Sequence, residues 1–258
     1  MKAIKEDWNA MAQAYEEFNN SPDSYSYNIE WPAVKKMLPD LTGKKILDIG
    51  CGTGIFTFLL EGYNPLKITG LDISESMLSI AKQKAEQRNS KATFIVGDAS
   101  YTDQYVNEKF DLIFSSTTSH YIENLDKLFE SMKKCMEDNG HIILSIIHPI
   151  YSSMYPIEHG DTFPKDEEWH IRYLDKSVRA YIQPWIEYND RYEKRLSKSY
   201  HHLFSDYVNA INKAGLTICQ IEEPMPPESW KNESKESYEG YMETPTFMIM
   251  KLKRCKLP

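Results

Sequence analysis

Apolar residues in the first 43 positions recur at steps of three and four, which is the spacing of one face of an α-helix. The residues on this face are Trp8, Met11, Ala12, Tyr15 and Phe18. The turn formers at 21–23 (Ser-Pro-Asp) then interrupt the pattern, and positions 29–38 predict a second helix with Pro32 in its first turn. We therefore expect residues 1–43 to form an N-terminal helical cover.

From Lys44 the pattern changes to short apolar runs that alternate with amphipathic segments. The runs predict strands at Lys45–Ile49, 67–71, 92–96, 110–114 and 141–147. The segments between them predict helices at Ile55–Glu61, at 74–88 with Ser74 as N-cap, and at 125–136, with a turn at 139–140. Strands separated by helices form βαβ units, whose crossovers produce a parallel sheet with helices on both faces. The predicted fold class is α/β.

Two further apolar runs, at 216–222 and 246–253, have no predicted helix between them and are expected to close the sheet as an antiparallel pair. The stretch before them, 149–200, belongs to no βαβ unit and is rich in aromatic residues. Eight of the chain's 17 tyrosines lie between Tyr151 and Tyr207, which exceeds a proportional share. Because this stretch follows the carboxyl end of a strand, we expect a lid-like insertion that helps to form a substrate pocket.

At 258 residues the chain fits one large α/β domain. We expect a single domain built from the helical cover at 1–43, a cofactor-binding core at 44–148, the insertion at 149–200, and a C-terminal helix with closing strands at 201–258.

The chain carries 30 Lys and Arg against 38 Asp and Glu, a formal net charge of −8. Proteins that grip the nucleic-acid backbone need a basic face, so no nucleic-acid partner is expected. The longest apolar run, 142–147, is far shorter than the ~20 residues that span a bilayer, and no signal peptide is visible. The four scattered cysteines are typical of reduced thiols and show no metal-ligand spacing. We expect a cytoplasmic protein without a metal site or a membrane partner.

A glycine-rich segment, Asp48-Ile-Gly-Cys-Gly-Thr-Gly54, stands at the exit of the first predicted strand. Its glycines let the chain turn tightly and approach a ligand closely, and the next helix presents backbone N–H groups to that ligand. The spacing differs from the dinucleotide fingerprint GxGxxG, because Ile55 stands where the third glycine would fall. The carboxylate of Asp48 would repel a pyrophosphate and suits a cationic group. This argues against an NAD(P)-dependent oxidoreductase, which stays open as an alternative.

Two more carboxylates follow the second and third predicted strands. Because the carboxyl ends of parallel strands meet at one edge of a sheet, Asp72 and Asp98 are expected to lie near Asp48 on the ligand side. Asp72 can accept hydrogen bonds from both hydroxyls of a ribose. Asp98 can accept one from an adenine amine, while Ala99 offers its backbone N–H.

Four segments follow one another in order: KKILDIGCGTGIFTFLL at 44–60, ITGLDISESML at 68–78, TFIVGDAS at 93–100 and FDLIFSSTTSHYIEN at 110–124. They resemble the successive motifs of class I S-adenosylmethionine-dependent methyltransferases. The resemblance covers most of 8–148 and resumes with AGLTICQIEEP at 214–224. It implies a Rossmann-like doubly wound sheet of seven strands, in the order 3-2-1-4-5-7-6 with the last strand antiparallel, and S-adenosyl-L-methionine as cofactor.

The resemblance also implies a role for each matching residue. The implied cofactor-binding residues are Tyr15 as a cover, Asp48, Gly50, Cys51, Gly52 and Gly54 around the methionine part, Asp72 on the ribose, Ile73 and Met77 against the adenine, Asp98 and Ala99 at the adenine edge, and Ser115 beside the methionine part.

Methyl transfer needs in-line positioning of the nucleophile, the methyl carbon and the sulfur, and it needs a base only where the acceptor loses a proton. His148, after the fifth strand, is the first candidate because it adjoins the insertion, and His120, after the fourth strand, is the second. The turn after the fourth strand lacks the Asn/Asp-Pro-Pro-aromatic sequence of base-amine methylation, and no carboxylate cluster for Mg²⁺ follows it.

We therefore expect an enzyme that methylates an O, N, S or C nucleophile of a small molecule, and the aromatic insertion favours an aromatic acceptor. A non-catalytic S-adenosylmethionine-binding protein stays open as a further alternative. The aromatic residues of the insertion could equally form the interface of a homodimer.

Overall fold

A seven-stranded sheet forms the centre of the computed structural model, which describes residues 2–21, 24–159, 169–183, 186 and 191–255. Its order is β3-β2-β1-β4-β5-β9-β8. The strands are β1 Lys45–Ile49, β2 Lys67–Asp72, β3 Thr93–Val96, β4 Phe110–Ser116, β5 Met136–Ile147, β8 Leu216–Glu222 and β9 Phe247–Arg254. Strands β1 to β5 pair in parallel, and β9 runs antiparallel to β5 and β8. Since β8 and β9 are the sixth and seventh strands of this sheet, the predicted order and the antiparallel last strand are confirmed.

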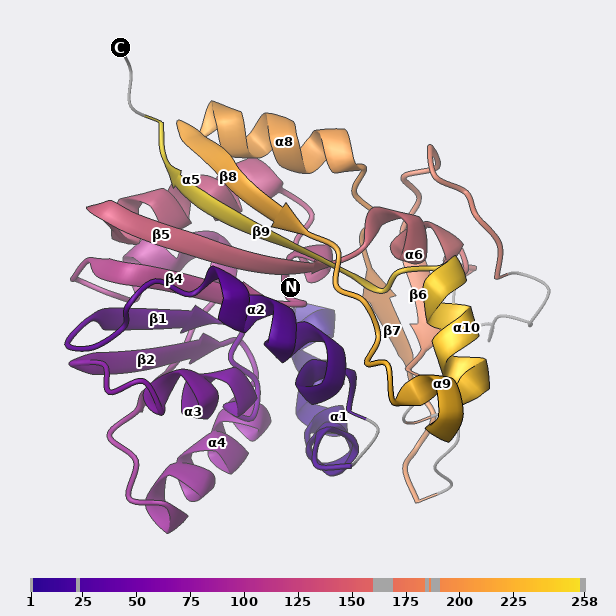
Figure 1. The fold of residues 1–258 in the computed structure, drawn as a ribbon, viewed down its shortest axis with the longest axis horizontal. Coiled ribbons are helices and arrows are strands. Elements are labelled where there is room, and N and C mark those ends of the chain that lie inside the picture. The colour runs from indigo at the N-terminus through magenta and orange to yellow at the C-terminus, as the bar shows by residue number, and fades with distance from the viewer. Residues whose placement is uncertain (1, 22–23, 160–168, 184–185, 187–190, 256–258) are drawn as a thin grey trace.

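Helices cover both faces of the sheet (Figure 1). The longer ones are α1 Lys2–Asn19, α2 Trp31–Met37, α3 Ile55–Glu61, α4 Glu75–Gln87, α5 Leu125–Cys135, α8 Phe204–Lys213 and α10 Lys235–Glu243. Buried residues of α2 and α3 pack with Ile46 on one face, whereas those of α5 and α8 pack with Leu47 and Ile49 on the other. The side chains of a strand alternate between faces, so neighbours in β1 enter different cores. The helices on both faces agree with the pattern, and the doubly wound arrangement is the one that the resemblance implied.

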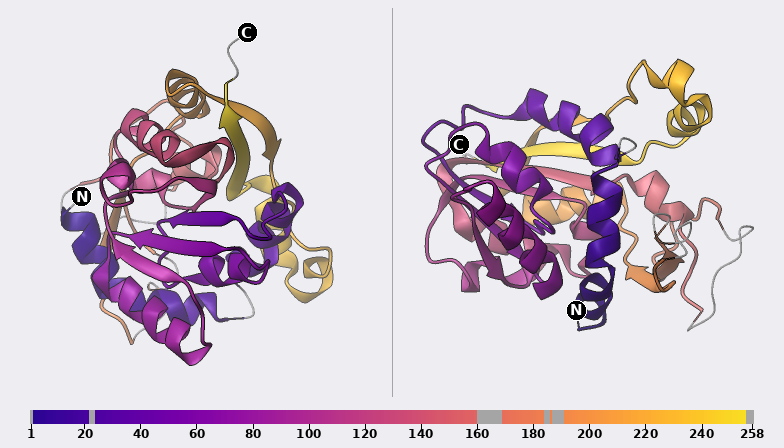
Figure 2. Two further views of the ribbon diagram at one scale, coloured as in Figure 1. Left: turned by 90° about the vertical axis from the view of Figure 1, so that its left-hand side faces the viewer. Right: turned by 90° about the horizontal axis from the view of Figure 1, so that it is seen from below.

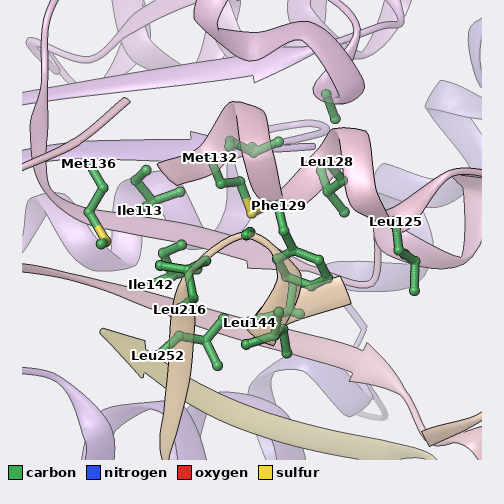
Figure 3. Close-up of a cluster of buried hydrophobic side chains, with 14 of the residues drawn as sticks. Ile113, Leu125, Leu128, Phe129, Met132, Met136, Ile142, Leu144, Leu216 and Leu252 are labelled. Carbon is green, nitrogen blue, oxygen red and sulfur yellow. The ribbon is translucent and has the colours of Figure 1, made fainter. Parts of the chain in front are cut away.

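The core between α5 and the sheet holds the central strands in place. Phe129 and Met132 of α5 lie over Ile113 and Ile142 of β4 and β5, and all four side chains are fully buried (Figure 3). Truncating a side chain such as Phe129 to alanine in a core of this kind costs about 3–5 kcal/mol. This packing gives the strand ends beyond it a rigid base.

The parallel strands end on the side of the sheet where most of the remaining elements gather (Figures 1 and 2). These elements are α1, α6 Pro149–Met154, α9 Trp230–Glu233, α10, and the antiparallel pair β6 Arg179–Ile182 and β7 Leu196–Ser199. Short helical turns, η1 Ser26–Glu30, η2 Ala99–Gln104 and η3 Ser119–Tyr121, also lie there. Across the residues that the structure describes, no helix is both long and apolar enough to cross a bilayer.

Three local predictions were wrong. Residues 139–140 form no turn, because they belong to β5, which begins at Met136. The register between β4 and β5 shifts here. The strands are so close that a Cβ at Gly140 would lie 3.0 Å from the Phe110 carbonyl oxygen. Helices α9 and α10 lie between β8 and β9, although their polar sequence predicted none. The helix expected to start at His201 starts at Phe204. None of these changes the strand order.

Candidate functional site

A cavity of about 640 Å³ lies at the carboxyl ends of β1, β2 and β4. Its lining includes α1 residues, the glycine loop after β1, the turn after β4, and aromatic residues from the stretch 149–200. Among the described residues that line it there is no lysine or arginine. The cavity has the position and size that small-molecule sites have in open α/β sheets.

The glycine loop forms the floor of the cavity. Gly50, Gly52 and Gly54 have φ angles of 72°, 53° and 83°, a region that favours glycine. A Cβ at Gly50 would lie 1.9 Å from Thr118 Oγ1, so the loop and the turn after β4 approach each other closely. Gly50, Cys51 and Gly52 line the cavity, whereas Gly54 is the N-cap of α3 and lies outside the lining.

Asp48 lies at the end of β1 with its carboxylate almost fully buried. Its Oδ2 accepts a hydrogen bond of 2.5 Å from Thr57 Oγ1 of α3. The pKa of Asp48 is raised to about 7, chiefly by burial and also by the charges of Asp72 and Glu30, while the hydrogen bond from Thr57 opposes the shift. A buried carboxylate of this kind is a site for a cationic group.

Asp72 joins the end of β2 to the glycine loop. Its Oδ2 accepts from the Gly52 N–H at 2.9 Å and its Oδ1 from the Ser74 N–H at 2.8 Å. Burial raises the pKa of Asp72, and these backbone bonds partly counter it. Each carboxylate oxygen keeps acceptor capacity, so both hydroxyls of a ribose could bind here.

The predicted adenine residues divide into two groups. Ile73, Met77 and Ala99 line the cavity. Asp98 does not line it, because its side chain accepts from the Ser100 N–H at 2.8 Å and caps η2. The structure therefore brings Ala99 to the cavity while the Asp98 carboxylate serves the local turn.

The predicted serine of β4 faces away from the cavity. Ser115 Oγ donates to the Ile49 carbonyl at 2.9 Å, beneath the glycine loop. The next residue, Ser116, lines the cavity instead. Successive residues of a strand point to opposite faces, so only one of these two serines lines the cavity, and the role implied for Ser115 stays a prediction.

Behind Ser116 lies a carboxylate that the sequence analysis missed. Ser116 Oγ donates to Glu30 Oε1, and Glu30 Oε2 has no hydrogen-bond partner among the described residues. Glu30 is fully buried, and burial raises its pKa to about 7. It ends the π-helical turn η1, a geometry that is often found at functional sites. No periodicity marks such a turn in the sequence.

Tyr15 of α1 lies over the glycine loop, and its implied role as a cover for the cofactor stays a prediction. Its ring carbon Cε1 would lie 3.7 Å from a Cβ at Gly52, and Tyr15 lines the cavity. The Trp8 ring contacts Tyr15 edge-on, with 5.6 Å between centroids. Helix α1 is held there by Asn9, whose Oδ1 accepts from Ser74 Oγ at 2.7 Å and from the Ser76 N–H at 3.1 Å.

The two candidate bases occupy different places. His120 lines the cavity, and its Nδ1 is buried without a hydrogen-bond partner among the described residues. Burial lowers the pKa of His120 to about 3, so the ring is neutral near pH 7. His148 lies outside the cavity: its Nε2 pairs with Glu223 at 3.1 Å and its Nδ1 accepts from the Ile150 N–H. It lines a separate hollow that also contains Phe204.

The cavity's chemistry fits the implied cofactor. Buried carboxylates with raised pKa values and no basic residue in the described lining suit a ligand with a positive charge. S-adenosylmethionine carries a sulfonium cation and a ribose, and carboxylates such as Asp48 and Asp72 can bind groups of these two kinds. Glycine at 50 and 52 leaves the backbone open to close approach.

Known proteins point in the same direction. The sequence profile of a family described as "Methyltransferase domain" matches residues 40–192. A Haemophilus influenzae protein named only as uncharacterized is 30% identical over 230 residues, which cover 87% of this chain and 88% of the relative. The malonyl-(acyl-carrier protein) O-methyltransferase 2 of Ilyobacter polytropus is 31% identical over 192 residues, 66% of this chain and 64% of that protein.

A crystal structure of an S-adenosylmethionine-dependent methyltransferase from Mesorhizobium loti aligns with a TM-score of 0.67 and 29% identity, over 87% of this chain and 97% of that one. The profile match alone covers more than half of the chain, and the strand order and glycine loop agree with it. The chain therefore belongs to the class I S-adenosylmethionine-dependent methyltransferases.

Proposed function

We propose that this enzyme transfers the methyl group of S-adenosyl-L-methionine to a small molecule that binds in the aromatic part of the cavity. The observation that carries the proposal is the continuity of the cavity, which joins the glycine loop and Asp72 to Tyr155 and Tyr181 within about 640 Å³. Sites of this volume hold small ligands. The net charge of −8 offers no general attraction for nucleic acid.

In this proposal the cofactor residues keep the roles that the resemblance implied, with two changes. Asp72 accepts from the ribose hydroxyls, Ile73 and Met77 pack against the adenine, and Asp48 lies near the positive methionine part. Ser116 takes the place of Ser115, and the Asp98 side chain supports the turn that presents Ala99.

When bound, S-adenosylmethionine supplies an electrophilic methyl group on a positive sulfur. The acceptor atom forms a bond to the methyl carbon while the carbon–sulfur bond breaks, and the electron pair of that bond stays on sulfur. Where the acceptor carries a proton, the neutral ring of His120, which lines the cavity, is the candidate to accept a hydrogen bond from it, and the proton is released to solvent as the new bond forms. His148 becomes the weaker candidate because Glu223 already pairs with it.

The described parts of 149–200 support the proposed pocket-forming role of that insertion, because Tyr151, Tyr155, Trp169 and Tyr181 line the cavity. The single-domain division, the homodimer and the cytoplasmic location remain predictions. The cavity, with its own acceptor end, supports catalysis rather than mere cofactor storage.

Asp72→Ala is the first test of the site. We expect S-adenosylhomocysteine affinity, measured by isothermal titration calorimetry, to fall by about tenfold to a hundredfold, because charge-assisted hydrogen bonds are worth about 1.5–3 kcal/mol. Asp111→Asn is the matched control: Asp111 also accepts a backbone N–H, from Lys45, but at the opposite end of β1. Equal affinity in Asp72→Ala and the wild type would refute the assigned ribose contact.

A second experiment identifies the acceptor. The full chain is incubated with metabolite extracts and S-adenosylmethionine that carries a deuterated methyl group, and mass spectrometry detects the labelled product. We expect one small-molecule product that disappears with Asp72→Ala and persists with Asp111→Asn. Label found only in protein or nucleic acid would contradict a small-molecule acceptor.

A further inference from the structure

The end of the cavity away from the glycine loop is an aromatic chamber, defined by Trp8, Tyr121, Tyr155, Trp169 and Tyr181. Tyr155 and Tyr181 stack with 4.0 Å between centroids, and Trp169 meets each of them edge-on at 5.7 and 6.0 Å. Trp8 contacts Tyr121 edge-on at 5.4 Å. Aromatic walls in these orientations favour a planar ring as their ligand.

The chamber contains no full charge among the described residues that line it. The carboxylates in the cavity lining are Asp48 and Asp72, which belong to the glycine-loop end. The pKa values reflect this division: after burial, the charges of Glu30, Asp72 and Asp48 raise the pKa of Tyr15, whereas for Tyr155 the further influences are neighbouring tyrosines. A charged acceptor would therefore enter the chamber without a counter-charge, at a cost of several kcal/mol.

Two polar side chains, Gln183 and His120, lie beside the aromatic residues of the chamber. The amide of Gln183 donates to the Tyr121 hydroxyl at 3.1 Å and to the Tyr181 hydroxyl at 3.4 Å, which holds these two rings together. His120 lies against Tyr121, with 4.0 Å between ring centroids, and is only 4% exposed. Its Nδ1 has no hydrogen-bond partner in the described part of the chain. Buried polar atoms are normally paired, and His120 lines the cavity, so a group on a bound ligand is a candidate partner for its ring.

We propose that the methyl acceptor is an uncharged planar ring that carries a hydroxyl group, with the ring inside the aromatic chamber and the hydroxyl bonded to His120. This inference rests on the proposed function and narrows its substrate class. The hydroxyl oxygen then forms the bond to the methyl carbon while the carbon–sulfur bond breaks, and the hydroxyl proton, hydrogen-bonded to the neutral His120 ring, is released to solvent. Rings that carry a carboxylate or a phosphate group are disfavoured, because the described residues that line the cavity supply no positive charge.

Matched naphthalenes test the charge requirement. The full chain is saturated with S-adenosylhomocysteine and titrated with 2-naphthol, 2-naphthoate and protonated 2-(aminomethyl)naphthalene, which share one ring system. We expect 2-naphthol to bind at least about tenfold more tightly than either ion, since a site lacking a partner for a buried group discriminates strongly. Equal or tighter binding of either ion overturns the proposal, and a preference for the ammonium compound would indicate an amine acceptor.

Two variants test the assigned contacts. Trp169→Leu should weaken 2-naphthol binding by about tenfold and leave S-adenosylhomocysteine binding unchanged, whereas Tyr63→Leu, outside the cavity, should change neither. His120→Phe should abolish the preference for 2-naphthol over 2-methylnaphthalene, because the phenyl ring keeps the shape and removes the nitrogen. A preference that survives in His120→Phe, or unchanged affinity in Trp169→Leu, refutes the chamber assignment.

The same titrations distinguish a failure of the proposed function from a failure of the proposed substrate class. If S-adenosylhomocysteine does not bind the wild type, the proposed function fails. If it binds and 2-naphthol does not, the proposed function stands and the substrate class is wrong. Melting temperatures of all variants are compared with that of the wild type, so that a folding defect is recognised.

Discussion

Among individual residues, three carboxylates at the cofactor end have the widest consequences: Asp48 and Glu30 are buried and Asp72 is half-buried. Burial is the leading cause that raises the pKa of Asp48, Glu30 and Asp72, and the two neighbours raise that of Asp48 further. Such carboxylates are costly to ionise until a cation joins them. We therefore expect these carboxyl groups to ionise more fully when a positively charged ligand binds beside them.

The affinity for S-adenosylmethionine should consequently depend on pH. Asp48 and Glu30, with pKa values near 7, are mainly neutral at pH 6 and ionised at pH 8, so the affinity should rise with pH, by up to about tenfold. S-adenosylhomocysteine lacks the sulfonium charge and should gain less. Calorimetric titrations of both ligands at pH 6, 7 and 8 measure the difference, and Glu30→Gln should reduce the slope. Parallel pH profiles for the two ligands would disprove this electrostatic account.

Most of the cofactor end was predictable from residue types, and the failures have local causes. The motif after β1 and the strand-end position of Asp72 identified the floor and one wall of the cavity. Ser116 lines the cavity and the predicted Ser115 does not, because the end of a strand does not reveal which face each residue takes. Glu30 escaped notice because a buried carboxylate in a helical segment looks like a surface residue until its surroundings are known.

At the scale of elements, helix α1 and the start of α4 form one unit over the cofactor loop. Asn9 links them through Ser74 and Ser76, and Lys84 of α4 pairs with Glu16 of α1 at 2.7 Å in a largely buried position. Tyr15, one residue before Glu16, then covers Gly52. The position of the cover therefore depends on contacts at both ends of α4.

Asn9→Ala tests this dependence. Two hydrogen bonds disappear, so we expect the free energy of unfolding in urea to fall by about 1–2 kcal/mol and S-adenosylhomocysteine binding to weaken several-fold. Glu6→Ala removes an exposed ion pair of the same helix, with Lys2, and should change both quantities very little. A loss of stability with no change in binding would show that α1 does not contribute to the cofactor site.

The elements of the core were predictable because βαβ units repeat one simple pattern, whereas the segments around the acceptor end follow none. The sequence predicted the strands of the sheet to within a few residues, apart from the start of β5. The pair β6–β7, in contrast, was not foreseen, since strands this short give too few alternating positions. Its placement depends on tertiary contacts, such as the stacking of Tyr181 on Tyr155.

At the scale of the whole molecule, the core and the cofactor floor are separate regions, and each contains one buried cysteine. Cys135 is the last residue of α5 and belongs to the core, Cys51 lies in the glycine loop, and Cys219 and Cys255 are exposed. Burial raises the pKa of Cys51 and raises that of Cys135 to about 12, so both buried thiols are protonated and unreactive. The labelling rate of each buried thiol therefore measures how often its own region opens.

Thiol labelling can therefore show whether the cofactor floor opens independently of the core. With iodoacetamide and peptide mass spectrometry, we expect Cys219 and Cys255 to react quickly, Cys51 slowly, and Cys135 only on global unfolding, because a site beside a cavity opens locally at lower free energy than a packed core. Saturating S-adenosylhomocysteine should slow Cys51 at least about tenfold and leave Cys219 unchanged. If the ligand slows Cys51 and Cys135 equally, the floor and the core open together, and the idea of a separately mobile cofactor floor is wrong.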